Sequence, residues 1–226
     1  GIAAIAVLVS GCASIDQGLM AVTDQVSSVD PVTGERQVNL VPEEQEIKEA
    51  SDTADNILAE AKSNGVKTDG QIPQYAQVIR VFDRLKAVTH RKELPWEIHV
   101  LNVDDWNAFT IGGGKIFILS GIFAGDAALK TDDELAVVIA HEMAHVSARH
   151  SSEKGAKIAL MKGASKKLKR DQGFEASFTT NQEDEADRYG ALYMALAGFD
   201  PRVGEQVWKK LHAATGSYTG DMQYDH

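Results

Sequence analysis

The sequence predicts an α+β domain that is mostly helical and contains a small sheet of three or four strands. Between residues 73 and 85, apolar side chains recur at spacings of three and four, as on one face of a helix. Residues 96–102 alternate in polarity, and 106–123 contain two apolar runs around three glycines, which is typical of short strands. The run 135–150, LAVVIAHEMAHVSARH, is long and apolar enough for a buried helix.

Composition indicates a globular chain with one sizeable core. Of the 226 residues, 43% are hydrophobic and 25% are charged, which is ordinary for a folded domain of this size. Acidic residues outnumber basic residues by 33 to 23, so the formal net charge is −10. This balance argues against nucleic acid as the main partner, because nucleic-acid binding favours a basic surface.

The first twelve residues are typical of the end of a signal peptide. Residues 2–9 are apolar but too few to span a bilayer, and small residues precede the single cysteine, Cys12. Residues 9–12, VSGC, resemble a bacterial lipobox, in which the cysteine becomes the lipidated N-terminus; the alternative is a buried helix with an incidental cysteine. We therefore expect a signal-peptide remnant over 1–12, with Cys12 lipidated.

The remaining chain is expected to form a tether over 13–30 and the folded domain over 31–226. A lipid on Cys12 would anchor the protein, since each buried CH₂ contributes about 0.8 kcal/mol. The next residue is Ala13 rather than Asp, which by analogy with enteric lipoproteins favours the outer membrane. The expected location is the bacterial cell envelope, at the periplasmic face of that membrane.

Turn and cap residues place the other elements in order. A turn is expected at 30–37, DPVTGERQ, between short extended pieces. Pro42 and two glutamates begin a helix that ends near Ser63, and a second helix begins near Pro73. Glycines 112–114 predict a tight hairpin, because the spacing of a phosphate-binding loop is absent. Helices are expected from Asp132 and over 153–170, 181–197 and 201–213.

The helix that begins at Asp132 contains a metal-binding pattern. His141 and His145 lie four residues apart, so both imidazoles can face one ion from the same side of the helix. Glu142 lies beside that face and can reach a water on the ion. This H-E-x-x-H arrangement suits zinc, whose catalytic sites leave one position to water. The ion would compensate for burying these titratable groups, which is otherwise costly.

The pattern does not extend to a third histidine with the metzincin spacing. That spacing requires glycine at 148 and histidine at 151, and the sequence has Ala148 and Ser151. His150 is five residues beyond His145, which rotates it off the ligand face. We interpret His150 as a structural residue, a cap or a packing residue.

A later helix offers a carboxylate instead. In residues 181–190, NQEDEADRYG, Glu183 and Asp187 share one face, and Gly190 continues it without a side chain, which permits a close approach to the histidine helix. We predict Glu183 as the third ligand and Asp187 as the acceptor of a hydrogen bond from the other ring nitrogen of a ligand histidine. Glu185 falls on another face and is expected to be solvent-exposed. The alternative is a solvated acidic helix face.

These motifs resemble those of the zinc metallopeptidases that include HtpX and the CAAX prenyl proteases, in their soluble, periplasmic, lipoprotein-type branch. HEMAH at 141–145 matches the family's H-E-x-x-H, and EDEAD at 183–187 matches its E-x-x-x-D, whose first glutamate is a metal ligand. DPVTG at 30–34 and NAF at 107–109 are also similar to family signatures.

The resemblance implies a zincin-like fold with one Zn²⁺ per chain. It further implies a zinc-dependent endopeptidase for envelope or periplasmic proteins, misfolded ones included, with Glu142 as general base on a zinc-bound water. The alternative is an outer-membrane assembly or chaperone-like factor on the same scaffold. The intact Glu142 favours the enzyme.

Three further expectations concern the surroundings of the site. Residues 106–111 are expected to offer a backbone edge to an extended peptide. Asn107, Tyr189 and Tyr193 are candidates for the donor that stabilises an oxyanion. His226 is a possible latch ligand that would occupy the open zinc position and keep the enzyme latent.

Overall fold

The computed structural model describes residues 27–29, 36–38, 42–150 and 180–216. The chain divides into two units, Gly1–Gln45 and Glu46–His226. In the first unit, strands β1 (Ser27–Val29) and β2 (Arg36–Val38) pair antiparallel with Ser28 opposite Gln37. This pairing agrees with the extended pieces expected on either side of the turn. Cys12 and His226 lie outside the described residues, as does the helix expected over 153–170.

A three-stranded sheet forms the β part of the second unit. Its strands are β3 (Glu97–Leu101), β4 (Ala108–Gly112) and β5 (Lys115–Leu119), in the order β3-β5-β4. β5 is buried along its whole length and pairs parallel with β3 and antiparallel with β4. Glycines 112–114 all have positive φ; Gly112 ends β4, and Gly113 and Gly114 form the tight turn to β5 that the sequence predicted. β4 therefore lies at the edge of this sheet.

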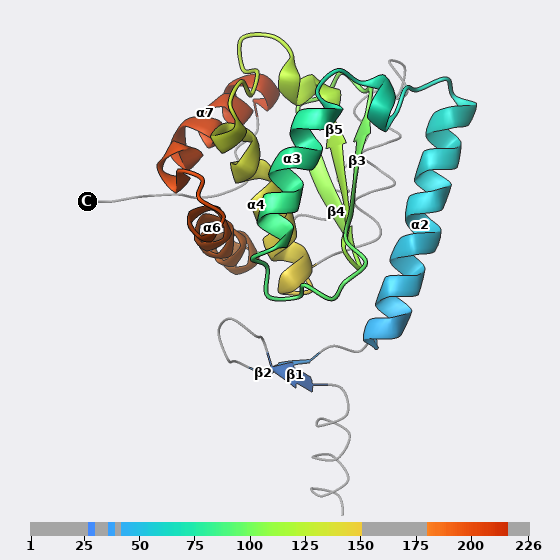
Figure 1. Cartoon of the computed structure of the whole chain (residues 1–226), viewed down its shortest axis with the longest axis vertical. Helices are drawn as coiled ribbons and strands as arrows, with labels where there is room; N and C mark the ends of the chain where they lie inside the picture. The colour runs from blue at the N-terminus through green and yellow to red at the C-terminus, as the bar shows by residue number, and fades with distance from the viewer. Residues whose placement is uncertain (1–26, 30–35, 39–41, 151–179, 217–226) are drawn as a thin grey trace, which may run out of the picture. The chain divides into compact units, whose positions relative to one another are not determined.

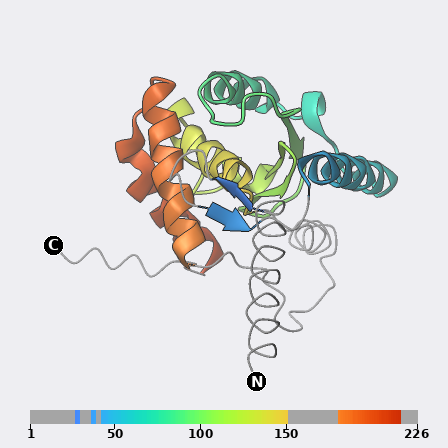
Figure 2. The ribbon, with the colours of Figure 1, turned by 90° about the horizontal axis from the view of Figure 1, so that it is seen from below.

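Helices cover both faces of the sheet (Figure 1). On one face, α2 (Glu43–Ser63) contributes Ala50, Ala54 and Ile57 to a core that includes Phe117 and Leu119 of β5. Side chains alternate along a strand, so Ile116 and Ile118 point to the other face. That face is covered by α4 (Asp132–Ser147), which also contacts α3 (Tyr75–Lys86) and α6 (Thr180–Leu196). Figure 2 shows α4 between the sheet and α6.

Nearly every residue of α4 is buried, because the helix contacts other elements on several sides. Its N-terminus forms a capping box, in which the Glu134 backbone N–H donates to Thr131 Oγ1 over 3.1 Å and the Glu134 carboxylate accepts from the Thr131 backbone. Arg80 of α3 pairs with Asp132 in the first turn. The helix therefore begins at Asp132, as predicted.

The last helix in the described part of the chain contacts α4 near its N-terminus through an ion pair. A 3₁₀ turn, η3 (Pro201–Val203), precedes α7 (Gly204–Thr215), so the helix expected over 201–213 begins with a tighter turn. Lys210 of α7 donates to Glu134 Oε1 over 2.6 Å and to the Ala128 carbonyl over 2.9 Å. This ion pair is mostly shielded from water, with the two side chains 20% and 10% exposed.

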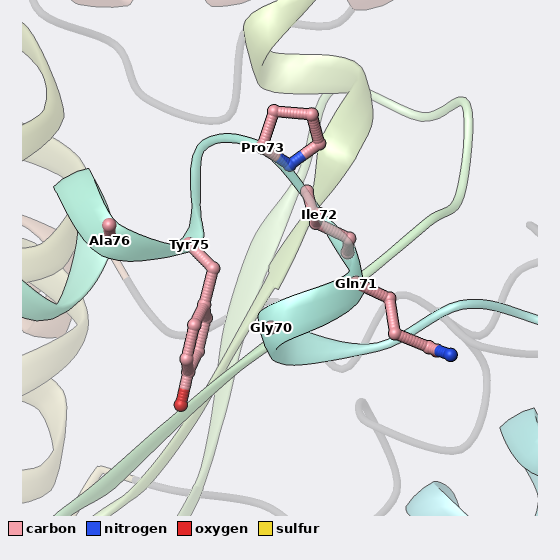
Figure 3. Close-up of a pocket in the computed structure, with 6 residues that line it drawn as sticks. All are labelled: Gly70, Gln71, Ile72, Pro73, Tyr75 and Ala76. Carbon is pink, nitrogen blue, oxygen red and sulfur yellow. The ribbon is translucent and has the colours of Figure 1, made fainter.

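A hollow of about 410 Å³ lies where the 3₁₀ turn η1 (Asp69–Gln71) meets α3 (Figure 3). Its lining residues are Gly70, Gln71, Ile72, Pro73, Tyr75 and Ala76. None of the predicted site residues lines it.

Among the described residues, no helix combines the length and the apolar character needed to cross a bilayer.

The Lys210–Glu134 pair generates a prediction about stability. Burial alone would raise the pKa of Glu134, but the hydrogen bond from Lys210 and the backbone N–H of Lys130 outweigh burial and lower it. Lys210→Met should lower the free energy of unfolding at pH 7 by about 1–3 kcal/mol, because it removes a partner of a largely buried carboxylate. Urea denaturation would measure this, with the exposed neighbour Lys209→Met as the matched control.

The pH dependence of this effect follows from the sign of the shift. A carboxyl whose pKa is lower in the folded state stabilises the protein above its unfolded pKa, and that stabilisation is lost as the pH falls through the folded pKa. The difference between wild type and Lys210→Met should therefore shrink below about pH 4.3, the ordinary value for glutamate. A difference that stays constant from pH 7 to pH 3 would contradict the prediction.

Candidate metal centre

The donor atoms of His141, His145 and Glu183 converge at the contact between α4 and α6. The two Nε2 atoms are 3.0 Å apart, Glu183 Oε2 is 3.3 Å from His141 Nε2, and Glu183 Oε1 is 3.8 Å from His145 Nε2. Within the described part of the chain, this is the one group of three or more His, Cys, Asp or Glu donors that could hold a metal ion. Zinc takes nitrogen and carboxylate ligands at about 2.0–2.2 Å, so donors separated by these distances fit one ion between them.

Gly190 permits this convergence. A Cβ added at Gly190 would lie 3.2 Å from the backbone nitrogen of His141 and 3.4 Å from the carbonyl carbon of Ala140. The neighbouring atoms belong to a helix backbone and cannot rotate away as a side chain could. The prediction that a glycine at this position allows a close helix–helix approach is confirmed.

Asp187 lies on the opposite side of the His141 ring from Glu183. Its Oδ1 is 2.9 Å from His141 Nδ1, the contact expected for a carboxylate that orients a ligand histidine. Burial would lower the pKa of His141, but hydrogen bonds to Asp187 and Glu183 outweigh burial and raise it. Burial lowers the pKa of His145. The carboxylates thus favour positive charge at the ring of His141, whereas burial keeps the ring of His145 neutral.

Glu183 is held in its charged form by the same contacts. Burial would raise the pKa of its carboxyl, but the hydrogen bonds with His141 and His145 lower it to about 2. A carboxylate that is ionised at all physiological pH values is an effective ligand for a divalent ion. The arrangement of two imidazoles and one ionised carboxylate fits zinc in donor type and in number.

Glu142 is buried beside the donor group, next to the edge strand. Burial raises the pKa of its carboxyl to about 7, with His141 opposing this shift and Glu183 adding to it. The carboxylate also accepts a hydrogen bond from the backbone N–H of Thr110 in β4. A carboxyl with a pKa near neutrality can both accept and return a proton at physiological pH.

The prediction that Glu185 is solvent-exposed is wrong. Its side chain is 23% exposed, it accepts a hydrogen bond from the Tyr189 hydroxyl over 2.9 Å, and its Oε2 lies 3.5 Å from His150 Nε2. His150 in turn brings its Nδ1 to 3.2 Å from His145 Nδ1. His150 is therefore not among the convergent donors but packs against a candidate ligand, which agrees with its interpretation as a structural residue.

The tyrosines considered as oxyanion donors have other partners. Tyr189 donates to Glu185, and the hydroxyl of the fully buried Tyr193 lies 2.8 Å from His90 Nδ1. Trp208 of α7 packs its ring edgewise on His141, with 5.1 Å between the ring centroids. Sequence reasoning missed Trp208, because no spacing within α7 relates it to the histidine helix.

Comparisons with known proteins agree with this geometry. The family model described as Peptidase family M48 matches residues 73–219. The chain is 34% identical over 203 residues to the mitochondrial metalloendopeptidase OMA1 of Schizosaccharomyces pombe, which covers 82% of this chain and 58% of that protein. It is 30% identical over 166 residues to the beta-barrel assembly-enhancing protease of Yersinia pestis, covering 63% of this chain and 33% of that protein.

A third relative extends the comparison to plants. The OMA1 metalloendopeptidase of Arabidopsis thaliana is 33% identical over 151 residues, covering 62% of this chain and 30% of that protein. The chain thus spans less than two thirds of the length of each of these relatives. These relatives include both mitochondrial and beta-barrel assembly proteases, so the comparisons do not single out one compartment.

The contact at Gly190 generates a prediction. Gly190→Val should push α6 away from α4, lower the affinity for Zn²⁺ and reduce the free energy of unfolding by about 1–3 kcal/mol, the usual cost of overpacking. Ala191→Val introduces the same side chain at the exposed neighbouring position and is the matched control. Zinc affinity would be measured by competition with a chelator. Equal affinity and equal stability in the two variants would contradict the role assigned to Gly190.

Proposed function

Because the chain belongs to peptidase family M48, we propose that it is a zinc-dependent endopeptidase that hydrolyses peptide bonds of cell-envelope proteins, misfolded ones included. The observation that carries this proposal is the convergence of His141, His145 and Glu183 with Glu142 beside them. Both metal ligation and proton transfer then have residues of the right chemistry within one buried site.

In this proposal, the side chains of His141, His145 and Glu183 hold one Zn²⁺ per chain. When bound, the ion supplies Lewis-acid chemistry that polarises the scissile carbonyl and makes water more acidic. Glu142 accepts the proton of the attacking water and later delivers it to the leaving amine, a role suited to a pKa of about 7. Asp187 accepts a hydrogen bond from His141 Nδ1, which leaves Nε2 available for the metal.

The substrate is proposed to bind as an extended strand along β4. The Leu119 backbone N–H donates to the Asn107 carbonyl, so by the alternation of an antiparallel pair the N–H of Thr110 points away from β5. That N–H donates to Glu142, and a paired peptide would compete for it and release the carboxylate. Backbone N-methylation of a cleaved peptide at alternate positions should raise KM; unchanged KM at every position would exclude this binding mode.

Location and anchoring remain proposals. We place the protein in the bacterial cell envelope, attached through a lipid on Cys12 to the periplasmic face of the outer membrane. The similarity to a beta-barrel assembly-enhancing protease supports envelope substrates. The latch at His226 also remains a hypothesis, and it is lost if His226→Ala leaves both metal geometry and basal activity unchanged. An assembly factor that uses the scaffold without hydrolysis is the alternative function.

Replacing the general base separates these functions. Glu142→Gln should retain zinc but lower the rate of casein cleavage by about 10²–10⁴-fold, because it removes proton transfer and keeps the ligands. His141→Ala should lose both zinc and activity. Asp184→Asn, at an exposed carboxylate on α6, is the control and should keep both. Cleavage by Glu142→Gln at the wild-type rate would rule out the proposed enzyme.

A further inference from the structure

The two candidate ligand histidines are oriented in different ways. His141 meets a carboxylate directly, since Asp187 lies 2.9 Å from its Nδ1. His145 has its Nε2 among the donor atoms and its Nδ1 at 3.2 Å from another imidazole nitrogen, that of His150. The ring of His145 is almost completely buried, with 1% of its side chain exposed. Its orientation therefore depends on neighbouring groups rather than on water.

The chain reverses after α4 to bring His150 to this position. Arg149 has φ +58°, a left-handed conformation that a non-glycine residue adopts only when its surroundings stabilise it. Glu46 of α2 supplies that support with a 2.7 Å contact to Arg149 Nε. The backbone N–H of His150 then donates to the His145 carbonyl over 2.8 Å. The turn thus places the two rings against each other.

The hydrogen-bond roles along this contact follow from the donor and acceptor inventory of imidazole. If His145 Nε2 is a lone-pair donor to a metal, its Nδ1 carries the hydrogen. His150 Nδ1 must then accept, so the hydrogen of the His150 ring lies on Nε2, which faces Glu185 Oε2 at 3.5 Å. Each ring nitrogen in this series of contacts then has one consistent role, and the series ends at the carboxylate of Glu185.

His150 does not have the geometry of a fourth ligand. Its Nδ1 faces the Nδ1 side of His145, whereas the convergent donors lie on the Nε2 side. Its Nε2 faces Glu185. The contact therefore acts on the metal site through His145.

We propose that His150, held by Glu185, is a positioning residue that sets the ring orientation and tautomer of His145 for metal binding. The inference rests on the proposed zinc site and adds a carboxylate–imidazole pair to it. This arrangement parallels the contact of Asp187 with His141, except that His150 lies between the ligand His145 and the carboxylate of Glu185. α6 then supplies a ligand and the orienting carboxylate for each histidine.

A matched pair of substitutions tests this role. His150→Asn places its amide oxygen near the position of the imidazole Nδ1 and keeps an acceptor for His145, whereas His150→Phe keeps the ring and removes the acceptor. Binding of Co²⁺ to the full chain would be followed by its visible absorption and by competition with a chelator. His150→Phe should lose about 10- to 100-fold in Co²⁺ affinity and show an altered absorption band. His150→Asn should restore most of the affinity and the wild-type band.

The role of Glu185 is tested on the same readouts. Glu185→Gln should weaken Co²⁺ binding less than His150→Phe does, and the double variant should be no weaker than His150→Phe alone, because Glu185 acts through His150. Asp184→Asn removes an exposed carboxylate from the adjacent position of α6 and should leave the affinity unchanged. Near-ultraviolet circular dichroism of the metal-free proteins would identify a variant that fails to fold. If His150→Phe fails to fold, the Co²⁺ affinities of Glu185→Gln and His150→Asn test the proposal instead.

Three negative results have different meanings. If wild type binds Co²⁺ or Zn²⁺ and His150→Phe binds with the same affinity and the same absorption band, the positioning role is overturned while the proposed enzyme stands. If Glu185→Gln weakens binding equally with and without His150, Glu185 does not act through His150. If wild type binds neither ion, the zinc site itself fails, and the inference fails with it.

Discussion

The close approach of α6 to α4 at Gly190 is the constraint on which the rest of the site depends. Glu183 and Asp187 lie on the same face of α6 as this glycine, so they meet the histidines only if the helix backbones come this near. A side chain at position 190 would have to displace the backbone of α4 at the first ligand. The metal-site geometry is therefore a consequence of helix packing, and the missing Cβ is as necessary to it as the donor atoms.

The same packing explains how a largely buried helix can contain His141, Glu142 and His145. An unpaired buried charge costs several kcal/mol, and the apolar residues of α4 offer no compensation for it. The compensation comes from α6, whose carboxylates contact the rings and raise the pKa of His141 against the effect of burial. These contacts concentrate negative charge in a place of low dielectric, where a divalent cation is strongly favoured.

Features that depend on local spacing could be predicted from the sequence, and features that depend on chain reversal could not. The helix over 43–63, the glycine hairpin and the shared face of Glu183 and Asp187 follow from periodicity and turn chemistry. His150 was interpreted correctly as a structural residue, but its contact with His145 could not be predicted, because α4 ends at Ser147. Glu185 was expected to be exposed because the position of His150 beside α6 was not foreseen. Arg149 leaves α4 in a left-handed conformation, stabilised by a residue about a hundred positions earlier in the chain.

Contacts of Glu46 and of Lys210 fix α4 at its two ends. At the C-terminal end, Glu46 contacts Arg149 and Arg91, and Arg91 also donates to the Val146 carbonyl over 2.9 Å. At the N-terminal end, Lys210 holds Glu134 of the capping box. A ligand set that spans one helix turn needs its backbone fixed to within a fraction of an ångström. Because α4 is secured from α2 and from α7, the approach of α6 can define the separation of the donors.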